Sequence, residues 1–206
     1  MTAFVRAKNT ILEIAKTSDK QLIIAIDGNC GSGKSTLASK LANALDANLF
    51  HMDDFYLPEI MKTEERMAEP GGNVDYERFK NEVMVPLLAG SSFMYRKFSC
   101  QVQGLGESVF VTPKRINIVE GAYALHPDLI YAYDLKVFMS HDYKTQCDRI
   151  MKRNGPEKLK TFIEKWIPLE NRYFEALGIK EKCDLVIDTG TDWGQGAGNA
   201  GRAGKD

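Results

Sequence analysis

The chain has 206 residues, with 27 Lys and Arg against 28 Asp and Glu and a formal net charge of −1 at pH 7. Hydrophobic residues make up 44% and charged residues 27%, close to the average of globular domains, which excludes collagen-like, coiled-coil and wholly disordered classes. A nearly neutral chain also lacks the broad positive surface with which proteins bind nucleic acids non-specifically. We therefore expect no nucleic-acid partner.

Apolar runs such as residues 22–26 are too short to cross a bilayer, and charges interrupt the N-terminal segment where a signal peptide is uncharged. This pattern predicts a cytoplasmic protein with no membrane partner. The four cysteines, Cys30, Cys100, Cys147 and Cys183, lie far apart and include no Cys-x-x-Cys pair. They are expected to be reduced packing residues, and no zinc site is predicted.

Strong apolar runs alternate with amphipathic stretches, a pattern typical of a parallel sheet covered by helices. Helices are predicted over residues 3–16, 34–45, 76–88, 143–152 and 157–177. Strands are predicted over residues 22–26, 48–52, 115–119, 135–139 and 185–187. Pro168 is expected to end or kink the last helix. Residues 92–98 and 107–111 are expected to form a hairpin whose turn contains Gly104 and Gly106.

This order of elements predicts an α/β fold, with one domain over residues 1–188. The connection over residues 57–74 is long for a compact domain, and connections of that length are usually functional or mobile. Residues 189–206 contain six glycines among 18 residues and almost nothing that a core would bury. We interpret this last segment as a flexible tail.

A glycine-rich segment, GNCGSGKS, follows the first predicted strand and leads into a predicted helix. It matches the Gly, four residues, Gly-Lys-Ser pattern of phosphate-binding loops in the required context. The glycines let backbone N–H groups surround a phosphate, and the positive end of the helix points at the same anion. Lys34 is expected at the β- and γ-phosphates, and the Ser35 hydroxyl at Mg²⁺. The predicted nucleotide-binding residues are Gly28, Asn29, Cys30, Gly31, Ser32, Gly33, Lys34, Ser35 and Thr36.

Parallel strands joined by right-handed crossovers place their carboxyl ends at one edge of the sheet. Glu120 ends a predicted strand there, as expected of the acid that helps hold Mg²⁺. Asp53 and Asp54 follow another strand and offer a second acid, suited to accept a proton from a hydroxyl, and spacing does not decide between them. Arg149 and Arg153 lie one helical turn apart and are expected to bring positive charge to the transferred phosphoryl group.

Beyond the phosphate loop, several segments resemble the family of P-loop small-molecule kinases that includes uridine kinase, phosphoribulokinase and bacterial pantothenate kinase. They are MDDFY at 52–56, NVDYERF at 73–79, Tyr95, IVEGAYAL at 118–125, and DLKVFMSHD followed by RIMKRN at 149–154. The resemblance is strongest to uridine kinase-like proteins and runs from about residue 22 to 187. It implies a P-loop fold with a five-stranded parallel sheet, a hairpin at about 92–111 over the substrate and a lid at about 149–160.

The resemblance also implies roles that spacing does not assign. Asp53 is implied as the general base for the substrate hydroxyl, and Arg153 as the lid arginine that faces the phosphates. Asp75 is implied to bind substrate hydroxyls. The residues expected at the substrate are Asp53, Tyr56, Asp75, Tyr95 and Arg149; those expected in catalysis are Asp53, Lys34 and Arg153; those expected at the metal are Ser35 and Glu120.

The chain departs from the nucleoside kinases of this family in the hairpin and the lid. Tyr95 is followed by Arg96 and Lys97 where the family has Asp-Phe, and Cys100 stands where a histidine is usual. Arg149 is followed by Ile150, where the family has a second arginine. These positions are expected to recognise the base and hold the phosphates, so the departures leave the acceptor open.

The predicted function is ATP- and Mg²⁺-dependent transfer of the γ-phosphoryl group to a hydroxyl of a small metabolite, with a nucleoside first. The alternative acceptors are pantothenate, a glycerate-like acid or a sugar phosphate, and Arg96 and Lys97 favour an anionic one. A regulatory NTP-binding module is the alternative from another class, although the guanine-reading string Asn-Lys-x-Asp does not occur. A second copy of the chain is a candidate partner, through the N-terminal helix and the hairpin aromatics.

Overall fold

The computed structural model describes residues 1–99 and 101–190. Its helices are α1 (Ala3–Thr17), α2 (Lys34–Leu45), α3 (Glu64–Ala68), α4 (Tyr76–Phe79), α5 (Val85–Leu88), α6 (Tyr143–Thr161) and α7 (Ile167–Leu177). Its strands are β1 (Leu22–Gly28), β2 (Asn48–His51), β3 (Phe93–Ser99), β4 (Gly104–Val111), β5 (Ile116–Glu120), β6 (Leu135–Ser140) and β7 (Leu185–Asp188). The predicted tail lies outside the described residues from residue 191 onward, as does Cys100.

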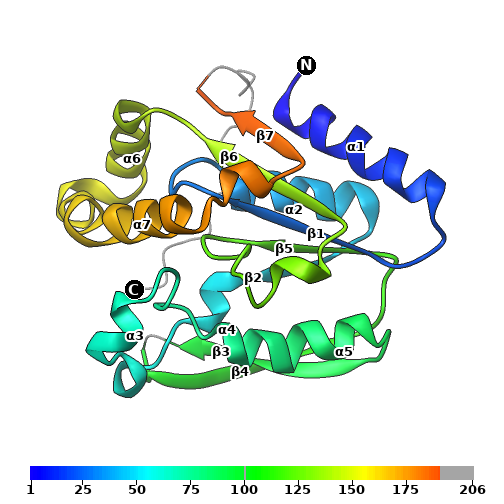
Figure 1. Ribbon diagram of the computed structural model, residues 1–206, viewed down its shortest axis with the longest axis horizontal. Coiled ribbons are helices and arrows are strands. Elements are labelled where there is room, and N and C mark those ends of the chain that lie inside the picture. The colour runs from blue at the N-terminus through cyan, green and yellow to red at the C-terminus, as the bar shows by residue number, and fades with distance from the viewer. Residues whose placement is uncertain (100, 191–206) are drawn as a thin grey trace.

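Five strands form one parallel sheet in the order β2-β5-β1-β6-β7, and β3 pairs antiparallel with β4 in a separate hairpin (Figure 1). The predicted α/β fold, with a five-stranded parallel sheet and a hairpin, is confirmed. β1 lies at the centre of the sheet and all of its residues are buried. Such burial explains why its residues 22–26 are continuously apolar rather than alternating. No helix of the described residues is long and apolar enough to cross a membrane.

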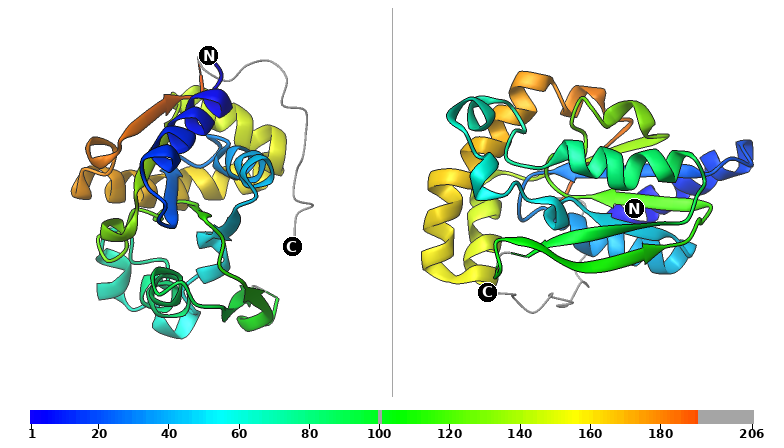
Figure 2. Two further views of the ribbon diagram at one scale, coloured as in Figure 1. Left: turned by 90° about the vertical axis from the view of Figure 1, so that its right-hand side faces the viewer. Right: turned by 90° about the horizontal axis from the view of Figure 1, so that it is seen from below.

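Alternate residues of β1 pack into two cores, because successive side chains of a strand point to opposite faces. Ile24 and Ile26 belong to the core that α1 and α2 cover. Ile23 and Ala25 belong to the other core, which includes residues of segment 76–88, the hairpin and α7. Figure 2 shows these layers from two further sides. Because the sheet is packed on both faces, the carboxyl ends of β1, β2 and β5 are held in place at one edge.

The hairpin turn lies earlier in the chain than the glycines predicted. Gly104 pairs with Ser99 inside the ladder, and Gly106 lies within β4 where the register shifts. A Cβ atom on Gly106 would approach the Ser99 Cβ atom to 3.2 Å, so this glycine permits a close approach of the two strands. The prediction that both glycines form the turn was therefore wrong, since glycine inside a strand marks close backbone contact as well as turns.

The helical path from α6 to α7 changes geometry twice. It breaks at Gly155, whose φ of +81° is outside the helical region. A wider π-type turn over residues 162–166 then precedes α7, and the Ile167 N–H donates to the Phe162 carbonyl. Pro168 lies in the first turn of α7, where its missing N–H costs nothing. The proline thus marks the start of a helical segment rather than its end.

The connection over residues 57–74 is held in place by Arg66. The Arg66 guanidinium donates to both carboxylate oxygens of Glu77 at 2.6 Å and to the Val74 carbonyl at 3.0 Å. It also lies 4.1 Å from the centre of the Tyr76 ring, which stacks on His126. These contacts attach the connection to the start of α4. They position residues 73 and 74 at the rim of the cavity described next.

Candidate active site

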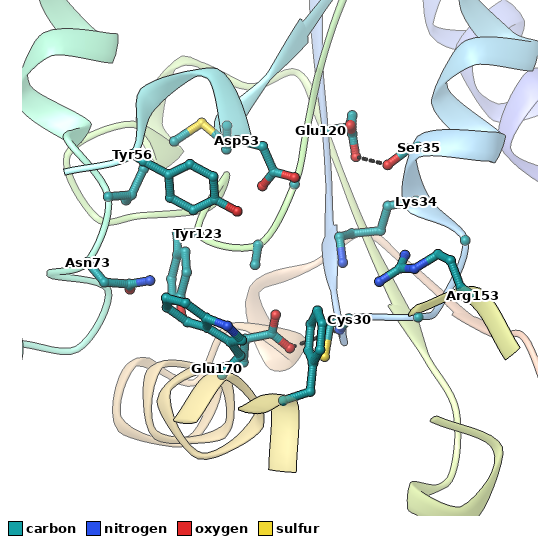
Figure 3. Close-up of a pocket in the computed structure, with 18 of the residues that line it drawn as sticks. Cys30, Lys34, Ser35, Asp53, Tyr56, Asn73, Glu120, Tyr123, Arg153 and Glu170 are labelled. Atoms are coloured by element: carbon teal, nitrogen blue, oxygen red, sulfur yellow. Dashed lines mark hydrogen bonds between the residues drawn. The ribbon is translucent and has the colours of Figure 1, made fainter. Parts of the chain in front are cut away.

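A cavity of about 210 Å³ opens at the carboxyl edge of the sheet (Figure 3). Its walls come from the phosphate loop, the turn after β2, the segment after β5, the end of the 57–74 connection, α6, the turn over residues 162–166 and α7. The predicted site residues that line it are Cys30, Gly31, Gly33, Lys34, Ser35, Thr36, Asp53, Tyr56, Glu120 and Arg153. Segments that are far apart in the sequence therefore meet at one site.

The phosphate loop owes its shape to glycines. Gly28, Gly31 and Gly33 have φ values of +131°, +81° and +90°, a region that favours glycine. A Cβ atom on Gly28 would come within 2.0 Å of a carbonyl oxygen of β6. Lys34 begins α2, and its Nζ donates to the carbonyls of Gly28 at 2.7 Å and Asn29 at 3.0 Å. The ammonium group thus lies over the loop, at the wall of the cavity.

Ser35 and Glu120 bring two hard oxygen ligands together. The Ser35 hydroxyl donates to Glu120 Oε2 at 3.1 Å, and the other oxygen of Glu120 contacts Nδ1 of His51. Glu120 is buried at the end of β5, beside the end of β2 that carries His51. Mg²⁺ binds one or two protein oxygens and completes its shell with phosphates and water. This donor set fits Mg²⁺ with a bound nucleotide.

Asp53 and Asp54 point in different directions. Asp53 lines the cavity and stays open to solvent through it. The protein that crowds it and the negative charge of Glu120 raise the pKa of the Asp53 carboxyl, against the opposing charge of Lys34. The Asp54 side chain is buried away from the cavity, and its Oδ2 makes no hydrogen bond with the described residues.

The two arginines of α6 that were predicted to act as a lid differ in their surroundings. Arg153 lines the cavity, donates to the Asn154 side chain at 2.6 Å and lies 5.9 Å from the centre of the Phe162 ring. Arg149 donates to the Gly31 carbonyl at 3.3 Å and to the hydroxyl and carbonyl of Thr189 at 2.8 Å each. Arg149 therefore connects the phosphate loop to the residue that follows β7.

Asp75 and Tyr95 lie outside the set of cavity-lining residues. Asp75 precedes α4 and caps it, because its carboxylate accepts from the Arg78 N–H at 3.1 Å. Its other oxygen lies 3.4 Å from the Arg78 guanidinium. Tyr95 is buried with its ring centre 5.4 Å from that of Phe55 and 6.1 Å from that of Phe50. In this structure, therefore, Asp75 contacts Arg78 and Tyr95 contacts core aromatic rings, and neither side chain faces the cavity.

No family model matches the chain. It is 26% identical to the uridine kinase of Lactobacillus helveticus (strain DPC 4571) over 196 residues, which cover 84% of this chain and 88% of that protein. It is also 26% identical to the uridine kinase of Clostridium tetani (strain Massachusetts / E88) over 192 residues, 84% of this chain and 89% of that protein. The chain is thus similar over most of its length to proteins named uridine kinase. A solved structure described as a "possible uridine kinase" from Bacillus stearothermophilus shares this fold, with a TM-score of 0.70 over 90% of this chain and 97% of that one at 22% identity.

Several lining residues of this uridine kinase-like chain carried no sequence prediction. Tyr123 and Asn73 both face the cavity. Burial raises the pKa of the Tyr123 phenol, which stays neutral. Glu170 accepts from the Cys30 N–H of the phosphate loop at 2.9 Å. The sequence did contain a signal for Glu170, because it is an acid within the apolar face of α7. That pattern alone does not show which cavity the acid faces.

Asp27 was also missed, although it directly precedes the phosphate loop. Its buried carboxylate accepts from the backbone N–H groups of Gly28 and Leu125 and from the Tyr173 hydroxyl. Burial raises its pKa to about 6, against these hydrogen bonds and the charge of Lys34. The residue links the start of the loop to α7 and to the segment after β5.

Proposed function

We propose that the chain transfers the γ-phosphoryl group of ATP to a hydroxyl of a small metabolite, with a nucleoside as the first candidate. The observation that carries the proposal is that Lys34 of the phosphate loop and the Asp53 carboxylate face one cavity. Two relatives named uridine kinase, each aligned over 84% of this chain, support the nucleoside.

In the proposed reaction, Asp53 accepts the proton of the acceptor hydroxyl as its oxygen attacks the γ-phosphorus. The bond between that phosphorus and the β–γ bridging oxygen breaks, and ADP leaves with the bridging oxygen. Lys34 and Arg153 stabilise the negative charge of the transferred group. Ser35 and Glu120 would hold Mg²⁺, which when bound neutralises phosphate charge.

One observation bears on the choice between neutral and anionic acceptors. Arg96 donates to the Leu105 carbonyl at 2.7 Å, and Lys97 lies 3.4 Å from the Glu107 carboxylate. Both cations thus bind groups of their own hairpin, and neither lines the cavity. The hairpin cations that favoured an anionic acceptor in the sequence give it no support in the structure, and a nucleoside stays first.

A panel of acceptors with ADP release as the readout tests the proposal. Uridine, cytidine, pantothenate, D-glycerate and a sugar phosphate are each supplied with ATP and Mg²⁺. We expect acceptor-dependent ADP release with a nucleoside and little with the anions. If an acid is phosphorylated and no nucleoside is, an acid replaces the nucleoside as the proposed acceptor. If ATP binds and no acceptor is phosphorylated, a regulatory NTP-binding module becomes the favoured function.

A further inference from the structure

Glu170 places a carboxylate in the wall of the cavity, deep inside the protein. It lies on α7, lines the cavity and is only 6% exposed. Oε2 accepts from the Cys30 N–H at 2.9 Å, the Cys30 thiol also interacts with this carboxyl group, and Oε1 is its second oxygen. In Figure 3 that second oxygen points into the cavity, on the side opposite Asp53. A carboxylate oxygen so placed offers a hydrogen-bond acceptor to whatever occupies the cavity.

The charges of the cavity are unevenly distributed. The two cations that line it, Lys34 and Arg153, lie on the side of the phosphate loop (Figure 3). The other side carries Tyr56, Asn73 and Tyr123, which are neutral. Residues 53 and 170 add two carboxylates that frame the space between these sides. No lining cation of the described residues therefore faces this other side, which we call the acceptor side.

We propose that Glu170 determines acceptor specificity: its Oε1 accepts a hydrogen bond from an O–H or N–H group of an uncharged acceptor bound at the acceptor side, which favours such acceptors over those that carry a carboxylate or phosphate. This inference rests on the proposed kinase function and names the class of its acceptor. It also assigns a role to a residue outside the motifs that carry the family resemblance.

The physical reason is that a carboxyl oxygen facing the cavity loses contact with water when an acceptor binds, and an acceptor with a donor group replaces that hydrogen bond. A site built to hydrogen-bond a substrate group discriminates strongly against molecules that lack it. An anionic acceptor would instead meet the carboxyl groups of Glu170 and Asp53, with no lining cation of the described residues facing the acceptor side. Both effects favour an uncharged acceptor rich in hydrogen-bond donors.

A purely structural role is the competing explanation, because Glu170 also anchors α7 to the Cys30 N–H. Glu170→Gln separates the two roles. The glutamine oxygen can still accept from the Cys30 N–H, while the charge is removed and the cavity-facing atom becomes a donor. A structural role predicts that Glu170→Gln changes nothing and that Glu170→Ala weakens ATP binding. A specificity role predicts that both variants affect the acceptor.

The experiment compares wild type, Glu170→Gln, Glu170→Ala and the control Glu175→Gln, which alters an exposed acid on the same helix. Uridine is the uncharged probe and D-glycerate the anionic probe. Steady-state ADP release gives kcat and KM for each probe and for ATP, and calorimetry with Mg²⁺ and a non-hydrolysable ATP analogue gives the Kd of each probe. Thermal unfolding verifies that every variant is folded.

We expect Glu170→Gln to raise the KM and Kd of uridine about tenfold or more. The KM for ATP should change less than twofold, the ratio of glycerate to uridine turnover should rise, and Glu175→Gln should match wild type. Unchanged uridine binding in both Glu170 variants, or a higher KM for ATP alone, would overturn the inference while the kinase function stands. If wild type binds neither probe and releases no ADP with any acceptor, the proposed function falls, and this inference with it.

Discussion

The two sides of the cavity are built in different ways. The phosphate side is built mainly from one continuous segment, residues 28–36, whose shape follows from glycines and the start of α2, with Arg153 of α6 beside it. The acceptor side comes from the turn after β2, the 57–74 connection and the segment after β5, with α7 alongside. The proposed phosphoryl transfer therefore depends on a continuous sequence motif, whereas the proposed choice of acceptor depends on side chains from several separate segments. Substitutions on the phosphate side should therefore slow transfer to every acceptor, and substitutions on the acceptor side should change which acceptor is used.

The largest expected effect lies on the phosphate side. Lys34→Ala removes the ammonium group beside the phosphate loop, and we expect kcat to fall about 10³-fold for every acceptor, because transition-state charge loses its stabilisation. The Kd of uridine should stay near that of wild type. Lys40→Ala, an exposed lysine on the same helix, is the control and should keep full ADP release. A loss confined to one acceptor would contradict the separation of the two sides.

Asp53→Asn tests the proton acceptor at the boundary between the sides. The substitution keeps the size of the side chain and removes its basicity, so kcat for ADP release should fall about 10²- to 10⁴-fold with little change in the acceptor KM. Asp54→Asn is the matched control, since that side chain is buried away from the cavity, and its kcat should fall far less. If Asp53→Asn kept the kcat of wild type while Lys34→Ala was inactive, Asp53 would not be the base.

The pH dependence of the wild type sharpens the same assignment. The pKa of Asp53 is raised above the ordinary value of 3.8, chiefly because surrounding protein disfavours its charged form. A base acts only when it is deprotonated. The value of kcat/KM should therefore reach its plateau above the raised pKa of Asp53 and fall tenfold per pH unit below that pKa. The acid limb should disappear in Asp53→Asn. A limb at or below pH 3.8 would contradict this assignment.

Arg66→Ala should disturb the acceptor side through its support. The guanidinium joins the 57–74 connection to Glu77 and the Tyr76 ring, so its loss should cost about 2 kcal/mol in the free energy of unfolding measured with urea. The KM of uridine should rise while that of ATP stays unchanged. Lys62→Ala removes an exposed ion pair with Glu59 in the same connection and should cost about 0.5 kcal/mol or less. Equal losses in the two variants would contradict the supporting role of Arg66.

The smallest expected effect comes from Tyr123→Phe. It deletes the phenolic hydroxyl at the acceptor side, a group whose hydrogen bonding is worth about 1 kcal/mol, and should raise the KM of uridine about fivefold. Tyr131→Phe at an exposed position is the control. A change in the KM for ATP in place of that for uridine would place Tyr123 with the phosphate side.

The sequence alone was sufficient for features that short segments encode. Apolar runs predicted the five strands of the parallel sheet, and the GNCGSGKS string predicted the loop whose glycines adopt positive φ. The rule that parallel strands end at one edge predicted that Glu120 and Asp53 would lie near Lys34, and all three line the cavity. These features depend on local conformation and on sheet topology, which the pattern of residues determines.

Only the tertiary structure decided which distant side chains share the cavity. It turned Asp75 toward Arg78 and Tyr95 into the aromatic core, and it brought Glu170 to the Cys30 N–H 140 positions away. Gly104 and Gly106 likewise entered a strand because of cross-strand approach rather than local turn preference. The physical reason is that such positions follow from how helices and hairpin pack on the sheet, and the same residue type fits a buried contact, a cap or a ligand site until that packing is known.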